Sequence, residues 1–292
     1  MTNGDFLNPL LARLDRLADR LDANFGPATT AELESDVLAW RWRASASAGG
    51  SLEAVASPHQ IRLEDLVGIE RQADVLDNNT RQFIKQLPCN NALLWGARGT
   101  GKSSLVKAML HRYSADGLRL VEVDAHDLID LPKVVAPMTG RDERFVLFVD
   151  DLSFDADDSS YRTLKAALDG SVAVAPENVL IYATSNRRHI VPEFQTDNNQ
   201  SRLVNGELHH GEAVEEKISL SERFGVWLSF HPFSQDLYLQ AVTQWLKNYG
   251  EVELDDTVRA EALKWALTRG NRSGRVAAQF ARDWVGRINL KD

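Results

Sequence analysis

The feature that most constrains this chain is the segment Gly96–Ser103, Gly-Ala-Arg-Gly-Thr-Gly-Lys-Ser, which matches the pattern G-x-x-x-x-G-K-[ST] at every fixed position. The apolar run Ala92–Trp95 precedes it, and the helix-forming run Lys102–Arg112 follows it. Glycine allows backbone conformations and close approaches that a Cβ atom would block, so successive N–H groups can surround an anion. The following helix presents its positive N-terminal end to the same charge. The pattern therefore predicts a strand–loop–helix unit that holds phosphate groups.

Each part of this loop has an expected role toward a nucleoside triphosphate. We expect Lys102 to reach the β- and γ-phosphates and the Ser103 hydroxyl to coordinate Mg²⁺. The loop residues predicted to contact the nucleotide are Gly96, Ala97, Arg98, Gly99, Thr100, Gly101, Lys102, Ser103 and Ser104. The sequence contains neither Asn-Lys-x-Asp, the usual guanine selector, nor the Leu-Ser-Gly-Gly run of transporter-type ATPases. ATP and Mg²⁺ are therefore the expected ligands.

A pair of aspartates follows the apolar run Phe145–Val149. A strand that delivers a carboxylate beside a phosphate loop suits Mg²⁺, which takes hard oxygen ligands and keeps several waters. We expect Asp150 to ligate the metal and Asp151 to orient or deprotonate the attacking water. The alternative is a strand that ends in a solvated acidic turn, because three further aspartates follow within seven residues.

Short apolar runs alternate with helical patterns from Ile61 onward, which predicts a mostly parallel sheet covered on both faces. The expected strands are Ala92–Trp95, Leu118–Val123, Phe145–Val149, Val179–Thr184 and Val226–Phe230. The expected helices between them are Lys102–Arg112, a short piece around Leu128–Val135, and Ser159–Leu168. The predicted fold class is α/β, a three-layer αβα core with a parallel five-stranded sheet.

The two ends of the chain are predicted to be helical. Leucines spaced by three and four residues favour a helix over residues 7–21, a second helix is expected from Thr30 to Arg43, and an Ala/Ser/Gly-rich linker follows over 44–57. After His231 the pattern indicates a helical lid, with helices at Leu237–Tyr249, Thr257–Thr268 and Ser273–Ile288. The expected divisions are therefore 1–60, 61–230 and 231–292. The polar segment 191–222, with seven acids and two bases, is expected to be a long loop that is either functional or disordered.

Composition excludes several classes of protein. Hydrophobic residues make up 43% of the sequence and charged residues 26%, which is typical of a globular chain. The formal net charge of −9 argues against a globally basic surface for nucleic acid or anionic membrane. The single cysteine, Cys89, excludes an intrachain disulfide framework and a multi-cysteine zinc site. With no membrane-length apolar run and no secretory pattern at residue 1, the expected location is the cytoplasm, with no membrane partner.

Further motifs, in order and spacing from about Ile61 to the C-terminus, resemble those of the AAA+ ATPases. In that resemblance Gly96–Ser103 is the Walker A motif and the aspartate pair is the Walker B motif. The segment Leu66-Val67-Gly68-Ile69-Glu70 is similar to the one that lies against the adenine, which implies nucleotide contacts for Val67 and Gly68.

The same resemblance implies three more catalytic residues. The segment Ala-Thr-Ser-Asn that ends at Asn186 is similar to the sensor-1 strand, in which a polar side chain reads the γ-phosphate or holds the water. The segment Ser-Leu-Ser-Glu-Arg-Phe-Gly resembles the one that carries the arginine finger, with Arg223 at the matching position. The segment 270–276 resembles the start of the sensor-2 helix, with Arg275 the better match and Arg272 the alternative.

Three segments narrow the resemblance to a bacterial branch known mainly as uncharacterised predicted ATPases. These are Asp-Asp-Leu-Ser-Phe, Ala-Thr-Ser-Asn-Arg-Arg-His and Glu-Lys-Ile-Ser-Leu-Ser-Glu-Arg-Phe-Gly. Most AAA+ proteins carry Asp-Glu where this chain has Asp150-Asp151. Because the second side chain is one methylene shorter, we expect slow hydrolysis.

The resemblance implies an ATPase that converts ATP to ADP and phosphate and drives the remodelling or assembly of a protein partner. It also implies a ring or partial-ring homo-oligomer whose ATP sites lie between subunits, with Arg223 serving a neighbour's site. Two alternatives stay open: a nucleotide-gated binding module with little hydrolysis, and a DNA-associated loader. The loader rests on six basic residues against one acid over residues 264–290 in the C-terminal helical region, Lys264, Arg269, Arg272, Arg275, Arg282 and Arg287 against Asp283. Nucleic acid is the less favoured partner, because no aromatic stacking platform is evident in the sequence.

Overall fold

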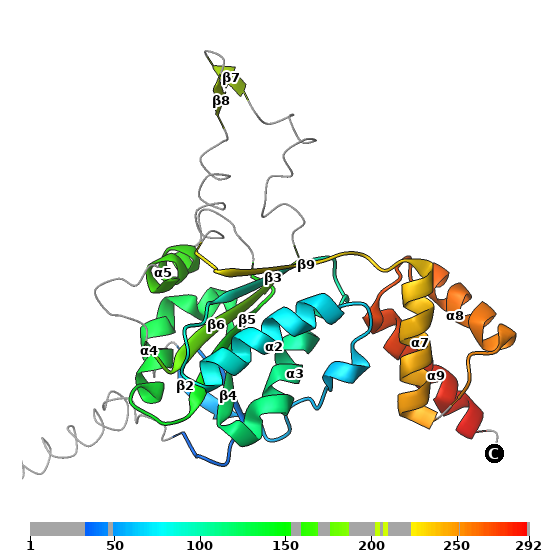
Figure 1. Cartoon of the computed structure of the whole chain (residues 1–292), viewed down its shortest axis with the longest axis horizontal. Helices are drawn as coiled ribbons and strands as arrows, with labels where there is room; N and C mark the ends of the chain where they lie inside the picture. The colour runs from blue at the N-terminus through cyan, green and yellow to red at the C-terminus, as the bar shows by residue number, and fades with distance from the viewer. Residues whose placement is uncertain are drawn as a thin grey trace, which may run out of the picture.

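A seven-stranded sheet forms the centre of the molecule (Figure 1). The computed structural model describes residues 33–45, 49–152, 159–168, 176–186, 202–204, 207–209, 223–250 and 252–290. The strands of this sheet are β1 (Ala39–Arg43), β2 (Ser51–Ala54), β3 (Ala92–Gly96), β4 (Leu118–Asp124), β5 (Arg144–Asp150), β6 (Val179–Ser185) and β9 (Val226–Phe230). Their order is β2-β1-β4-β5-β6-β3-β9, and every pairing is parallel except the antiparallel β1–β2 pair. The five predicted strands are confirmed, and they form the continuous block from β4 to β9.

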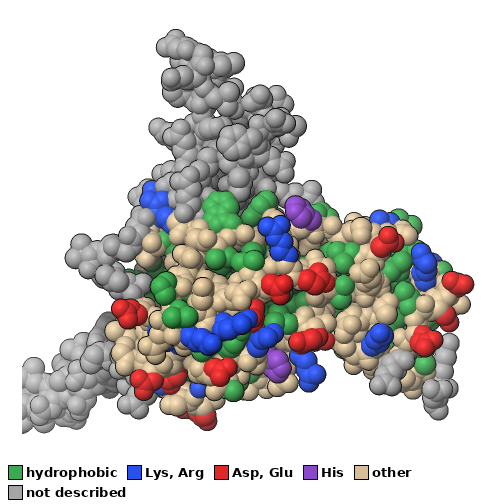
Figure 2. Space-filling model, in the orientation of Figure 1, with side chains coloured by type: hydrophobic (Ala, Val, Ile, Leu, Met, Phe, Trp, Pro, Cys, Tyr) green, Lys and Arg blue, Asp and Glu red, His purple; other side chains and the backbone are tan. Residues whose placement is uncertain are grey.

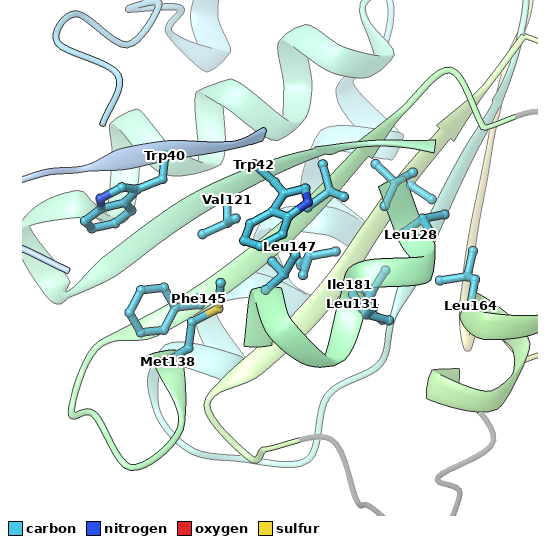
Figure 3. Packing of buried hydrophobic residues seen from close by; sticks show 14 of the residues in the cluster. Trp40, Trp42, Val121, Leu128, Leu131, Met138, Phe145, Leu147, Leu164 and Ile181 are labelled. Atoms are coloured by element: carbon cyan, nitrogen blue, oxygen red, sulfur yellow. The ribbon is translucent and has the colours of Figure 1, made fainter. Parts of the chain in front are cut away.

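The two additional strands correct the sequence prediction at the N-terminal side. Residues 39–43 form β1, so the helix predicted to run to Arg43 is wrong there, and β2 lies within the predicted linker. Trp40 and Trp42 alternate with arginines, and both indole rings pack into the core beside Val121 and Leu147 (Figure 3). Alternation of this kind suits a strand with one buried face. The predicted leucine-rich helix over 7–21 lies outside the described residues.

Helices cover both faces of the sheet, which confirms the three-layer architecture. On one face lie α2 (Glu70–Ile84) and α3 (Lys102–Tyr113) (Figure 1). They pack against the sheet through residues such as Leu76 and Leu105. On the other face lie the 3₁₀ segment η3 (Ala125–Asp130), α4 (Leu131–Val135), the 3₁₀ segment η4 (Ala136–Met138) and α5 (Ser159–Leu168). Shorter 3₁₀ turns are η1 (Leu63–Asp65) and η2 (Ser114–Asp116). Helix α2 was not predicted, whereas α3 and α5 match the expected helices.

Three helices after the sheet form a separate small core. They are α7 (Gln235–Gly250), α8 (Asp256–Thr268) and α9 (Gly274–Asn289), which matches the three helices predicted for a lid. The three helices lie at one side of the sheet (Figure 1). Their buried residues, among them Tyr238 and Phe280, form a cluster of their own. Within the acidic segment 191–222, the described residues form the antiparallel pair β7 (Arg202–Val204) and β8 (Glu207–His209). None of the described helices has both the length and the apolar character needed to cross a membrane.

Candidate nucleotide-binding site

The phosphate loop connects the end of β3 to the start of α3, as the sequence predicts. Gly96 adopts φ +129°, and a Cβ atom at this position would lie 2.1 Å from the carbonyl oxygen of Phe230 on β9. The next N–H, that of Ala97, donates to the same carbonyl at 3.0 Å. Strand β9 therefore fixes the start of the loop, and only glycine allows so close an approach.

Lys102 is buried beneath the loop, with 5% of its surface exposed. Its Nζ donates to the carbonyl oxygens of Gly96 (3.0 Å) and Ala97 (2.7 Å) and to Oδ1 of Asn186 (2.9 Å). Burial lowers the pKa of Lys102 to about 8, although the charge of Asp150 acts in the opposite direction. A buried ammonium of this kind gains more from an anionic ligand than an exposed lysine would.

The hydroxyl of Ser103 and the carboxylate of Asp150 meet beside this lysine. Ser103 Oγ donates to Asp150 Oδ1 at 2.7 Å, and Thr184 Oγ1, at the end of β6, donates to the same oxygen at 2.6 Å. One hydroxyl and one carboxylate are the sparse set of hard oxygen donors that Mg²⁺ uses together with phosphate and water. The two side chains therefore fit the predicted metal site.

Asp151 lies next to this pair, and its backbone adopts a positive φ, which is uncommon for residues other than glycine. Its φ is +54°, and its N–H donates to Thr184 Oγ1 at 3.0 Å. Asn186 Nδ2 donates to its Oδ1 at 2.6 Å, while Arg98 Nη2 lies 3.9 Å from its Oδ2. The αL conformation turns the chain directly after β5, and both carboxylate oxygens have a partner.

A cavity of about 770 Å³ opens above these residues, within the size range of small-molecule sites. Its lining comes from the phosphate loop, the strand ends and the lid: Ala97, Arg98, His126, Asp151, Leu152, Asn186, Pro232, Gly270, Asn271 and Arg272. The sequence interpretation missed His126, Pro232 and Asn271. His126 follows β4, the neighbour of β5, and because parallel strands end at one sheet edge, the predicted strand Leu118–Val123 contained a signal for it.

The lid contacts the phosphate loop through backbone and small side chains. The N–H of Arg275 donates to the Gly99 carbonyl at 3.3 Å. A Cβ atom on Gly99, whose φ is +74°, would lie 2.8 Å from Oγ of Ser273, the buried residue that caps α9. Of the two sensor-2 candidates, Arg272 lines the cavity, and the charge of Arg275 is close enough to lower the pKa of Lys102. Both arginines are therefore near the predicted phosphate site.

The predicted adenine segment lies at the junction of the sheet and the lid. Val67 packs against the lid cluster, and a Cβ atom on Gly68 would lie 2.3 Å from Cδ1 of Leu237 on α7. The Gly68 N–H donates to Oε1 of Glu70 at 2.8 Å. The adenine contacts of Val67 and Gly68 stay a prediction.

Arg223 is not brought to this site. It precedes β9, which is parallel to β3, so it lies beyond the end of the sheet opposite the phosphate loop. From Val226 to Phe230 the strand spans about 13 Å at about 3.3 Å per residue. The described cavity lining accordingly does not include Arg223.

One family model matches most of this chain. A family model described as "Protein of unknown function (DUF815)" matches residues 35–288. No curated protein matches the chain.

Solved structures show a distant likeness in fold. RuvB of Thermotoga maritima, described as a Holliday junction branch migration motor, is 16% identical with a TM-score of 0.51, over 79% of this chain and 67% of that one. ORC1 of Aeropyrum pernix in complex with DNA is 16% identical with a TM-score of 0.55, over 78% and 62%. This chain thus spans about two thirds of the length of the structures it resembles. The chain belongs to the DUF815 family, and its fold is that of the AAA+ P-loop ATPases.

Proposed function

We propose that this chain binds ATP together with Mg²⁺ and hydrolyses it to ADP and phosphate. The observation that carries the proposal is the convergence of Lys102, of the Ser103–Asp150 pair at 2.7 Å and of Asn186 beside the phosphate loop. These groups supply a cation, two hard oxygen ligands and a polar amide around the place where a triphosphate would lie.

Each of these residues has a separate proposed role in the reaction. Lys102, which is held on two loop carbonyls, would exchange these for oxygens of the β- and γ-phosphates. Ser103 and Asp150 would hold Mg²⁺, which when bound neutralises charge on the same phosphates. A water molecule attacks the γ-phosphorus, the bond to the β–γ bridging oxygen breaks, and Asp151 accepts the proton of the water.

Phosphate release at saturating Mg-ATP tests the proposal. We expect turnover by the wild type that is abolished in Asp151→Asn, while this variant still binds ATP by calorimetry. A wild type that binds no ATP would overturn nucleotide binding itself. Turnover that is the same in Asp151→Asn would remove Asp151 from the mechanism.

A nucleotide-gated binding module is the second candidate, and the geometry of Asp151 favours it. Both of its carboxylate oxygens already have partners, Asn186 at 2.6 Å and Arg98 at 3.9 Å. A base held in this way needs a rearrangement before it accepts a proton. ATP binding without phosphate release in the assembled protein would select the module over the enzyme.

We further propose that the active form is a ring or partial-ring homo-oligomer, with Arg223 acting on the site of a neighbouring subunit. Arg223 precedes the first residue of β9, at the end of the strand that lies away from the phosphate loop of its own chain. This position supports the arrangement. One lysine and one metal ion leave part of the transition-state charge uncompensated, and an arginine supplied in trans stabilises it.

The client that we propose is a protein, remodelled or assembled at the cost of ATP. DNA is the competing client, since the two solved structures named above carry a Holliday junction or DNA in their descriptions. The lid also places exposed arginines over aromatic rings, Arg269 on Trp265 at 4.8 Å and Arg287 on Trp284 at 5.1 Å. The face in Figure 2, however, mixes acidic and basic side chains over the sheet domain and the lid.

Turnover with and without DNA separates the two clients. Stimulation by single- or double-stranded DNA at physiological salt would establish DNA and overturn the protein client. No response to DNA, together with retention of a specific protein by Asp151→Asn in the presence of ATP, is the expected result.

A further inference from the structure

Arg98 occupies a position that the phosphate-loop pattern leaves free, yet its side chain lines the nucleotide cavity. Its Nη2 lies 3.9 Å from Oδ2 of Asp151, and both side chains are exposed, to 75% and 59%. The positive charge of Arg98 contributes to the lowered pKa of Lys102. Arg98 therefore acts electrostatically on the lysine that is expected to bind the phosphates. An exposed arginine contributes little to the fold, which leaves this placement to be explained by the site.

Four side chains form one continuous chain of contacts, and three of them, Arg98, Asp151 and Asn186, line the cavity. Lys102 donates to Oδ1 of Asn186 at 2.9 Å, and Nδ2 of the same amide donates to Asp151 at 2.6 Å. Arg98 lies at the other end, on the second oxygen of Asp151. A cation therefore stands at each end, and the carboxylate expected to act on the water lies between Asn186 and Arg98.

We propose that Arg98 recognises the γ-phosphate of ATP within its own subunit and releases Asp151 when it does so. The proposal rests on the proposed function and names the residue that couples ATP recognition to the catalytic carboxylate. ADP lacks the terminal phosphate and leaves Arg98 on Asp151. Arg98 is thus distinct from Arg223, which serves a neighbour.

The relative strength of the two partners supports this exchange. An ion pair that is exposed and as long as 3.9 Å is weak. A terminal phosphate carries more charge than one carboxylate and accepts the guanidinium in a bidentate manner. Transfer of Arg98 to the phosphate is therefore favourable, and it leaves Oδ2 of Asp151 available for the water.

Calorimetry with two nucleotides tests the recognition step. The probes are the non-hydrolysable analogue adenylyl imidodiphosphate and ADP, each with Mg²⁺. Arg98→Ala should weaken binding of the analogue by about tenfold and change ADP binding by less than about twofold, since one charge-assisted contact is lost only with the analogue. Arg259→Ala, which removes an exposed arginine from α8, is the matched control and should change neither.

Asp151→Asn tests the pairing, because it frees Arg98 without removing it. It should tighten analogue binding severalfold in the wild-type background and by a smaller factor in Arg98→Ala. Equal tightening in the two backgrounds, or an equal effect of Arg98→Ala on both nucleotides, would overturn the inference. If the wild type binds neither nucleotide, the proposed function itself fails; if Arg98→Ala matches the wild type with both, only the role of Arg98 fails.

Discussion

The candidate nucleotide site has two halves that differ in burial: the proposed phosphate anchor, with Lys102, Ser103 and Asp150, and the proposed water end, with Asp151 and Arg98. In the anchor, Lys102 is 5% exposed, and the Ser103–Asp150 pair is held by Thr184. At the water end, the side chains of Asp151 and Arg98 are 59% and 75% exposed. The anchor is therefore organised by the fold, whereas the water end is free to reorganise around a ligand or a neighbouring subunit.

The backbone explains this difference. The anchor lies between the central strands β3, β5 and β6, and the close approach of Gly96 to Phe230 locks the loop to the edge strand β9. Asp151 lies one residue beyond β5, where an αL turn leads the chain away from the sheet. We infer that nucleotide binding is built into the single chain and that hydrolysis depends on what reaches the exposed half.

The substitution with the largest expected effect impairs the water end and leaves the phosphate anchor intact. Arg223→Ala should lower turnover by about 10³-fold or more, because the charge on the transferring phosphoryl group loses its arginine. ATP affinity should stay unchanged, since the anchor is intact. Phosphate release and calorimetry on the same preparation measure both quantities.

A mixing experiment checks that Arg223 acts between subunits. Arg223→Ala and Lys102→Ala proteins combined should recover some turnover through sites built from one intact half of each. Light scattering that shows only monomer with ATP, together with turnover independent of concentration, would contradict the trans mechanism.

The second prediction concerns a substitution in the phosphate anchor. Lys102→Ala should weaken ATP binding by about 100-fold, equivalent to about 3 kcal/mol, because the charged contacts to two phosphates are lost. Lys107→Ala, on the same helix α3 but outside the nucleotide cavity, is the control and should bind as the wild type does. Equal affinity of Lys102→Ala and the wild type would remove Lys102 from the site.

The third prediction concerns the residue that joins the halves. Thr184 Oγ1 donates to Asp150 and accepts from the N–H of Asp151, so Thr184→Val keeps the shape and loses both bonds. Turnover should fall by about tenfold, corresponding to about 1.4 kcal/mol, with a smaller change in ATP affinity. Thr184→Ser retains the hydroxyl and should restore most of the rate. If valine and serine behave alike, the hydroxyl has no role.

Local patterns in the sequence predicted the central strands and the anchor, because each depends on neighbouring residues. Gly96–Ser103 carries its own strand–loop–helix context, and the apolar run before Asp150 specifies a buried strand end. The N-terminal strands were missed, although Trp40 and Trp42 alternate with arginines, because an alternation over five residues is a short local signal. Trp40 and Trp42 are buried only because β1 pairs with β4, where Arg41 also bonds Glu122 at 2.7 Å. The conformation of residues 39–43 therefore depends on β4, a strand that is distant in the sequence.

The same distinction holds within the site. Lys102, Asp150 and Asn186 were predicted at the positions where the structure brings them together. His126 and Asn271 reach the cavity from η3, directly after β4, and from the segment before α9. The predicted strand Leu118–Val123 and the segment 270–276 indicated these regions, but the tertiary packing determines which of their side chains line the cavity.

The smallest expected effect is a protonation change at the anchor. Burial lowers the pKa of Lys102 to about 8, so at pH 8 about half of these lysines are neutral before ATP binds. A bound triphosphate favours the charged form, so binding should take up about 0.5 proton at pH 8 and less at pH 7, with affinity falling as the pH rises above 8. Calorimetry in buffers of different ionisation enthalpy measures the uptake, and Lys102→Ala should abolish it. Uptake that persists in this variant would assign the proton to another group.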